Sequence, residues 1–169
     1  GVRLREIEPR DTPAVRELVL AGLAEHWGSV DQTLNRDLDD LAVAHPGSYT
    51  LVAEDPDGSI VGTGTLAPRS EHDVEVLRMS VATHLRGAGL GRRILDELVA
   101  VAFRWGARSV VLETTASWTA TVAFYEHCGF QITHYAEGPF CPDAWFERRL
   151  EGLTGAPPVG RSGDGGASM

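Results

Sequence analysis

Residues 77–93 restrict the fold of this chain more than any other segment. A β-prone run ends at Val81, and glycines at positions 87, 89 and 91 separate it from a stretch with helical spacing. Because glycine has no Cβ, it lets the backbone adopt a positive φ and approach a ligand closely. The first turn of a helix leaves N–H groups unpaired and carries a partial positive charge. The segment therefore predicts a strand, a tight turn and a helix N-terminus that can cradle a pyrophosphate.

Two other phosphate-binding loops do not fit this turn. A Walker loop requires Gly-Lys-Ser/Thr, and none of the 15 basic residues is a lysine. The dinucleotide fingerprint G-x-G-x-x-G has a spacing that Gly87, Gly89 and Gly91 do not provide. Taken alone, the turn also fits an ordinary tight connection in an α/β protein.

The remaining segments predict an α/β order of elements. Strands are expected at residues 3–7, 49–54, 60–66, 74–81, 109–114, 131–135 and 145–150, and helices from Asp11 onward and at residues 31–44, 90–102 and 118–128. Residues 55–58, Asp-Pro-Asp-Gly, are a strong turn signal, so the second and third strands should form a hairpin. Gly129 should close the last helix in the left-handed conformation. We expect a mixed, twisted sheet of about six or seven strands with helices on both faces.

Length and composition set the limits of the domain. The 169 residues suit one domain, expected at residues 1–150, and 43% of them are hydrophobic, which is ordinary for a globular core. Residues 151–169 are rich in Gly, Pro and Ser without periodicity, so we expect this tail to be disordered.

Charge and cysteine spacing exclude several classes of partner. The net charge of −9 disfavours nucleic acid and favours a cationic substrate. No apolar run approaches the ~20 residues of a membrane span, and no secretory leader is seen, so we expect a cytoplasmic protein without a membrane partner. Cys128 and Cys141 lack disulfide or metal-ligand spacing, so free thiols and no metal are expected. The oligomeric state stays open, a homodimer included.

Two motifs in this order resemble those of one enzyme family. Arg86-x-x-Gly89-x-Gly91 resembles the acetyl-CoA signature of the GNAT N-acetyltransferases, Gln/Arg-x-x-Gly-x-Gly/Ala. Downstream, residues 120–130, Ala-Thr-Val-Ala-Phe-Tyr-Glu-His-Cys-Gly-Phe, are similar to the family's Ala-x-x-x-Leu/Phe-Tyr-x-x-x-Gly-Phe segment. The two motifs together are far more specific than either one. The resemblance extends over roughly residues 3–150 and implies the family's fold, in which the fourth and fifth strands splay apart.

The resemblance also implies a role for individual residues. Backbone N–H groups that bind the pyrophosphate would come from Gly87, Ala88, Gly89, Leu90 and Gly91, with Arg86 nearby. Met79 and Val81 would offer backbone groups to the pantetheine arm of acetyl-CoA, the expected co-substrate. Tyr125 stands where the family keeps a tyrosine thought to protonate the leaving thiolate, although it could also be a core aromatic residue beside Phe124.

One position departs from the family pattern. The family often has Asn two residues before the alanine of its second motif, where this chain has Trp118. The side-chain contact to the cofactor is then lost or supplied elsewhere, for which Ser117 is the candidate.

Acyl transfer to an amine also needs a proton acceptor. An alkyl amine with a pKa near ~10.4 is almost fully protonated at pH 7, so a base must accept its proton directly or through water. Glu75 is the first candidate, because many relatives carry a Glu at this point of the strand. Glu71, His72 and Asp73 are alternatives, and the acidic residues could equally form a solvated edge.

These residues favour an N-acetyltransferase that moves an acetyl group from acetyl-CoA to a primary amine of a small molecule or peptide. The amine would attack directly in a ternary complex. The alternative is a non-catalytic acyl-CoA-binding regulator with the same fold. A relative that acetylates aminoacyl-tRNA is disfavoured by the net charge of −9, because tRNA affinity depends on phosphate neutralisation.

Overall fold

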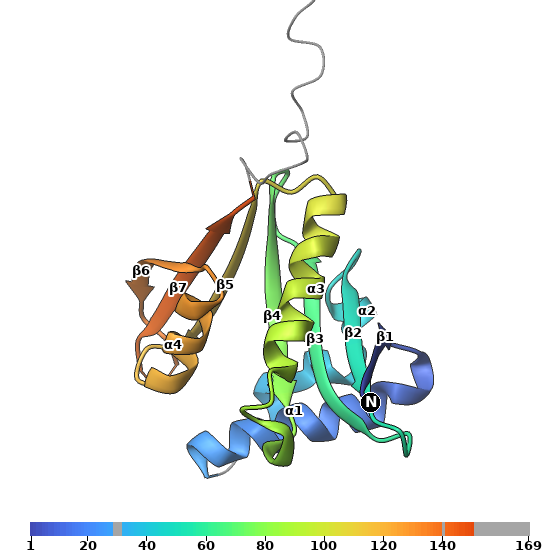
Figure 1. Cartoon of the computed structure of the whole chain (residues 1–169). Coiled ribbons are helices and arrows are strands. Elements are labelled where there is room, and N and C mark those ends of the chain that lie inside the picture. Colours follow the sequence, from blue (N-terminus) through green and yellow to red (C-terminus); the bar gives the residue numbers. More distant parts are fainter. Residues whose placement is uncertain (29–31, 140, 151–169) are drawn as a thin grey trace, which may run out of the picture. The chain divides into compact units, whose positions relative to one another are not determined.

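The computed structural model describes residues 1–28, 32–139 and 141–150. The chain divides into two compact units, each described by itself below (Figure 1). The N-terminal unit comprises Gly1–Pro68 and Val76–Val99, and the C-terminal unit comprises Arg69–Glu75 and the chain from Ala100 onward. The expected disordered tail at residues 151–169 lies outside the described residues, and the domain boundary at residue 150 stays a prediction.

The strands follow the order β1-β2-β3-β4-β5-β7-β6 in a seven-stranded mixed sheet, which confirms the predicted fold class. In the N-terminal unit, β1 (Arg3–Glu6) pairs antiparallel with β2 (Tyr49–Glu54), and β2 pairs with β3 (Ile60–Pro68). The predicted turn closes the β2–β3 hairpin, because Gly58 has a φ of 91° and its N–H donates to the Asp55 carbonyl at 3.0 Å. β3 is followed by β4 (Asp73–Val81), whose first residues belong to the C-terminal unit.

Two helices cover opposite faces of the strands in the N-terminal unit. On one face, α3 (Leu90–Arg104) packs so closely that a Cβ on Gly62 would lie 2.7 Å from Ile94 Cδ1, and one on Gly64 would lie 2.9 Å from Leu98 Cδ1. The glycines of β3 therefore leave room for these side-chain ends where α3 lies along the strand (Figure 1). On the other face, α1 (Thr12–Trp27) buries Val15 and Val19 in a cluster with Val52, Leu38 and Leu41.

The expected single helix at residues 31–44 is wrong. Its first residue lies outside the described part, and the remainder forms a 3₁₀ segment, η2 (Gln32–Asp39), followed by one turn of α-helix, α2 (Leu41–Ala44). Asn35 interrupts η2 with a φ of −126°, and the Asp40 carboxylate caps α2 by accepting the Val43 N–H at 3.2 Å. Short polar side chains compete for backbone groups in this way, and here they divide the helix in two.

The C-terminal unit contains the other half of the sheet. Residues Asp73–Glu75 of β4 pair parallel with β5 (Ser109–Thr115) over three residue pairs. β5 pairs antiparallel with β7 (Asp143–Arg149), which pairs with β6 (Gln131–Ala136). The helix α4 (Thr119–His127) precedes β6, and Gly129 ends it with a φ of 90°, as predicted.

Candidate active site

The glycine turn leads into α3 in the N-terminal unit, as predicted. After β4, a single 3₁₀ turn, η3 (Thr83–Leu85), reaches Gly87 and Gly89, whose φ angles are 82° and 86°. A Cβ at either position would meet no atom within 4 Å, so these glycines are required by the backbone conformation and leave open space beside the turn. The Arg93 N–H donates to the Gly89 carbonyl at 3.1 Å as the helix begins. The Ala88 N–H already donates to the Leu85 carbonyl at 3.4 Å, whereas the N–H groups in the first turn of α3 have no partner within the helix and can bind an anion.

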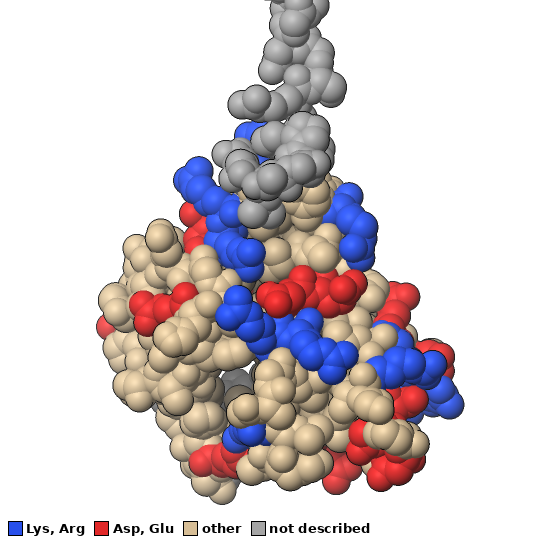
Figure 2. Space-filling model, in the orientation of Figure 1, with Lys and Arg blue, Asp and Glu red and all other residues tan. Residues whose placement is uncertain are grey.

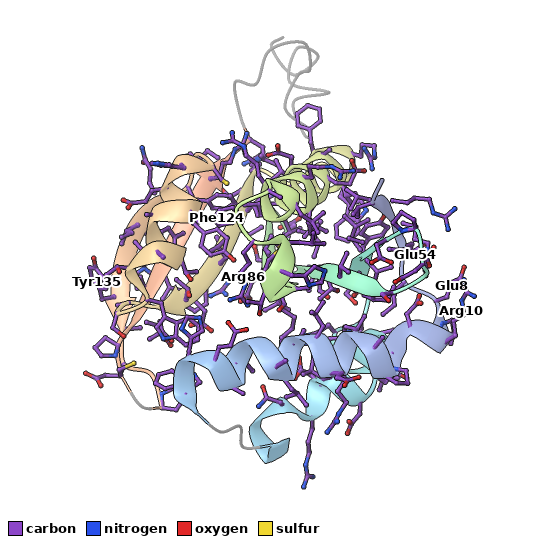
Figure 3. The ribbon with its side chains drawn as sticks, turned by 60° about the horizontal axis from the view of Figure 1, so that its bottom comes forward. Glu8, Arg10, Glu54, Arg86, Phe124 and Tyr135 are labelled. Atoms are coloured by element: carbon purple, nitrogen blue, oxygen red, sulfur yellow. The ribbon has the colours of Figure 1, made fainter. Side chains whose placement is uncertain are left out.

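Arg86 fastens this turn to α1. Its Nε donates to the Val81 carbonyl at 3.2 Å, and its Nη1 pairs with the Glu25 carboxylate of α1. The Thr83 hydroxyl donates to the same carboxylate at 2.5 Å, and these two hydrogen bonds, that of Thr83 first, lower the pKa of Glu25. Figure 3 labels Arg86 at this turn. The guanidinium predicted beside the pyrophosphate thus positions the turn, and it also occupies the Val81 carbonyl that was expected to face pantetheine.

β4 is irregular beside Met79, the other residue expected to offer its backbone. Arg78 has a φ of 55°, the only positive φ of a non-glycine residue in the described chain. Such a residue is strained and changes the direction of the neighbouring peptide groups. Its guanidinium donates to both carboxylate oxygens of Asp37, at 2.6 and 2.9 Å, and to the Asn35 side-chain oxygen at 2.9 Å.

The low pKa of the Asp37 carboxyl depends on its contact with Arg78. Burial alone would raise the pKa of Asp37, but the hydrogen bonds and charge of Arg78, with a smaller contribution from His45, lower it. Sequence reasoning missed Arg78, since nothing in the local pattern distinguishes a charged residue at a strand irregularity from one on a regular strand.

Tyr125 lies in the aromatic core of the C-terminal unit. The ring is 5.2 Å from that of Phe124, 6.1 Å from Phe130 and 5.7 Å from Phe146, measured between centroids. Burial raises the pKa of its hydroxyl, so the group stays protonated at neutral pH and is a weaker acid than an exposed tyrosine. The core role anticipated as an alternative is therefore present, and the proton-donor role stays a prediction. Ser117 is exposed in the turn before α4, where its carbonyl accepts the Thr119 N–H at 3.0 Å.

Glu75 already has a partner in the C-terminal unit. Arg69 Nη1 donates to Glu75 Oε1 at 3.0 Å, and only 16% of the Glu75 side chain is exposed. Of the alternative bases, Glu71 is 89% exposed and lies 3.9 Å from His72 Nε2. Glu71 and His72 are exposed, whereas Glu75 is not, so the solvated edge does not extend to Glu75.

Glu75 shares its face of the sheet with residues that sequence reasoning missed. Glu113 of β5 lies directly opposite Trp145 of β7. Asp143, two residues before Trp145, lies on the same face of β7. The Arg69 guanidinium lies 4.5 Å from the centre of the Trp145 ring. The pKa of Glu113 is raised, first by partial burial and then by the charges of Asp143 and Glu75 and a hydrogen bond with Asp143. The charge of Arg69 lowers it. Only strand register could have revealed this group, because Glu113 is distant in sequence from its neighbours.

The described chain contains neither a cluster of metal-binding side chains nor a helix that could span a membrane. Within residues 1–28, 32–139 and 141–150, no group of three or more His, Cys, Asp or Glu side chains is arranged to hold a metal ion. None of the helices described is long and apolar enough to cross a bilayer. Cys128, which is buried, and Cys141 are both free thiols. On the face shown in Figure 2, acidic and basic side chains lie beside each other, and Arg92 is 3.8 Å from Asp96 on α3, so the charge there is mixed.

Known proteins match both the sequence and the fold. The model of the acetyltransferase (GNAT) family matches residues 4–130. An uncharacterized N-acetyltransferase of Escherichia coli strain K12, YjgM, is 32% identical over 143 residues, which cover 80% of this chain and 85% of the relative. An acetyltransferase of the GNAT family from Staphylococcus aureus Mu50 shares the fold with a TM-score of 0.81, 17% identity and coverage of 89% of this chain and 100% of that one.

A second solved structure was obtained with a ligand. The PaiA N-acetyltransferase of Thermoplasma acidophilum, in complex with coenzyme A, has a TM-score of 0.72 at 14% identity and covers 88% of this chain and 99% of its own. Three findings agree: the family match over residues 4–130, the relative at 32% identity and the seven-stranded fold. The chain therefore belongs to the GNAT family of acetyltransferases and is an acyltransferase.

Proposed function

We propose that this enzyme transfers an acetyl group from acetyl-CoA to a primary amine of a small molecule or peptide. The observation that carries the proposal is the glycine turn at the start of α3, where Gly87 and Gly89 have positive φ angles and open space lies beside the turn. A pyrophosphate fits such a helix start, because both the N–H groups and the helix dipole favour an anion. A neighbour of the same fold is bound to coenzyme A, which supports this donor.

The donor would be held by backbone groups. The N–H groups of Gly87, Ala88, Gly89, Leu90 and Gly91 bind the pyrophosphate in this proposal. Met79 pairs with the pantetheine arm, because the irregular strand beside Arg78 redirects peptide groups away from the regular ladder. Val81 contributes less through its carbonyl, which accepts from Arg86, and Ser117 supplies an exposed hydroxyl near the start of α4.

The reaction itself would be a direct transfer in a ternary complex. The neutral amine attacks the thioester carbonyl, the C–N bond forms and the C–S bond breaks. The leaving thiolate takes a proton from Tyr125, whose buried hydroxyl is protonated at neutral pH. The amine proton passes to a carboxylate on the Glu75 face of the C-terminal unit. The net charge of −9 favours acceptors that carry positive charge.

Gly89→Glu tests the donor site. The variant puts a side chain and a negative charge into the turn, and we expect acetyl-CoA affinity to fall at least ~10-fold, because like charges repel and the positive φ is strained. Isothermal titration calorimetry measures this affinity. Gly58→Glu is the matched control, since Gly58 also has a positive φ in open space, in the β2–β3 turn of the same unit. An unchanged affinity for Gly89→Glu would refute the assignment of the turn.

Thiol release with a panel of amines tests the transfer. Wild-type enzyme should release free coenzyme A only when a suitable amine is present, and the amide product should form in equal amount. Binding of acetyl-CoA without turnover of any amine would instead favour the regulator and overturn the proposed activity.

A further inference from the structure

The two faces of the β5–β7 ladder differ completely in chemistry. On the face that carries Leu112 and Phe146, side chains pack into the core around Tyr125. On the opposite face, Glu113 stands across from Trp145, because successive residues of a strand point to opposite sides. Successive residues of β5, Leu112 and Glu113, therefore face an aromatic core on one side and polar side chains on the other.

Three carboxylates from three strands meet on the polar face. Glu75 comes from β4, where it pairs with Val111, while Glu113 comes from β5 and Asp143 from β7. Partial burial first, and then the charges of Asp143 and Glu75, raise the pKa of Glu113. One guanidinium, that of Arg69, faces these three groups. The surroundings are thus acidic and suit an approaching ammonium group.

The three carboxylates are not equivalent as proton acceptors. Glu75 is largely buried and one of its oxygens accepts from Arg69, which in turn is held over the Trp145 ring. Glu113 is exposed to solvent, so a substrate can reach it. A base works best when its own pKa approaches the working pH, and the direction of the shift at Glu113 is towards neutrality. Two further carboxylates belong to this face in the described chain: Asp73 lies two residues before Glu75 on β4, and Glu147 of β7 is paired with Arg149 at 3.4 Å.

We infer that Glu113, which is exposed on the face that it shares with Asp143 and Glu75, accepts the proton of the amine substrate in place of Glu75, whose carboxylate is paired with Arg69. The inference rests on the proposed function and names the polar face of β5 and β7 as the acceptor side. The substrate arrives as an ammonium ion, Glu113 removes one proton and passes it to water, and the free amine attacks the thioester. One ammonium and one acetyl-CoA give one amide, one coenzyme A with its thiol protonated, and one proton released to solvent.

The pH dependence of kcat/KM separates the roles of these carboxylates. In Glu113→Gln, we expect kcat/KM for the amine at pH 7 to fall ~100-fold or more and to recover partly as pH approaches the pKa of the amine, while acetyl-CoA affinity changes less than ~2-fold. In Glu75→Gln and Asp143→Asn, activity should persist and the acidic limb of the profile should move to lower pH, because a negative charge beside Glu113 is gone. Arg69→Met should move the limb to higher pH.

Two further variants keep the result interpretable. Glu147→Gln removes a carboxylate from the same face and should leave the profile unchanged, which controls for total charge. Glu113→Asp keeps the base and should recover part of the activity that Glu113→Gln loses. Circular dichroism and the melting temperature identify a variant that fails to fold, and Glu113→Asp then decides the question alone.

Two results are distinguishable failures. If Glu113→Gln keeps the wild-type profile while Glu75→Gln loses the acidic limb, Glu75 is the base and the inference falls, but the acetyltransferase activity stands. If wild-type enzyme acetylates no amine, the proposed function falls and this inference falls with it.

Discussion

Tyr125 and Glu113 lie in the same unit on opposite faces of the same strands, and burial is the first cause of the raised pKa of both groups. Burial is the main cause for Tyr125, which is enclosed by Phe124, Phe130 and Phe146. At Glu113, the charges of two other carboxylates add to partial burial. For a phenol, the shift keeps the proton on the oxygen and makes the group a weaker acid. For a carboxylate, the same direction strengthens an acceptor. Burial therefore has opposite consequences for the proton-donor role of Tyr125 and the proton-acceptor role of Glu113.

The largest effect should come from breaking the aromatic face. Phe146→Ala should reduce the free energy of unfolding by about 3–5 kcal/mol, because a fully buried ring is replaced by a cavity. Trp145→Ala, one residue away on the polar face, should cost only about 1–2 kcal/mol, from cross-strand packing and the contact with Arg69. Urea denaturation measures both. Equal losses would show that the two faces are equally part of the core; if Phe146→Ala does not fold, Phe146→Leu should still lose more than Trp145→Leu.

Removing one hydroxyl should sharpen the contrast without breaking the core. Tyr125→Phe keeps the ring in place, so we expect acetyl-CoA affinity and the melting temperature to stay close to wild type. Turnover should fall about 10–100-fold, less than the full effect of a general acid, since a thiolate with a pKa near ~8.5 needs only modest help. Steady-state kinetics with a saturating amine measures kcat, and Phe124→Leu serves as a control for packing beside the ring. A fully active Tyr125→Phe enzyme would remove the tyrosine from the mechanism.

The two faces also explain what the sequence could and could not predict. Gly87, Gly89 and Gly129 act through their own backbone, so a local pattern was enough to predict the turn, the helix start and the helix end. Glu113 acquires its character from Asp143 and Glu75, and only the register of three strands brings them together.

Two expectations, a single helix at residues 31–44 and an Arg86 guanidinium beside the pyrophosphate, differ from the structure because of polar side-chain contacts. Leu38 and Leu41 follow the helical spacing and are buried. The predicted helix at residues 31–44 is nevertheless divided, because Asn35 before Leu38 has a non-helical φ and Asp40 before Leu41 caps a separate turn. Arg86 matched the motif, yet its guanidinium is committed to Glu25 and to the Val81 carbonyl, a contact with α1 that no spacing within the motif could indicate.

The smallest effect tests the polar face through stability alone. A raised pKa means that the folded state binds the Glu113 proton more tightly than the unfolded state does, so ionisation of Glu113 opposes folding. Below the ordinary Glu pKa of ~4.3 both states are protonated and the cost is absent. As pH rises through the folded pKa the cost develops fully, and above that it stays constant. Glu113→Gln should therefore be slightly more stable than wild type at pH 7 and equal to it near pH 3.5. We expect a gain below ~1 kcal/mol, because Glu113 is exposed and solvent screens its neighbours.

Asp37→Asn should change stability in the opposite direction, because Arg78 lowers the pKa of Asp37. This variant should be less stable than wild type at pH 7 and should approach wild type as pH falls. Urea denaturation of the three proteins across this pH range measures both trends. A Glu113→Gln enzyme that loses stability at pH 7 would show that the three carboxylates do not repel, and it would remove the electrostatic reason for Glu113 to act as the base.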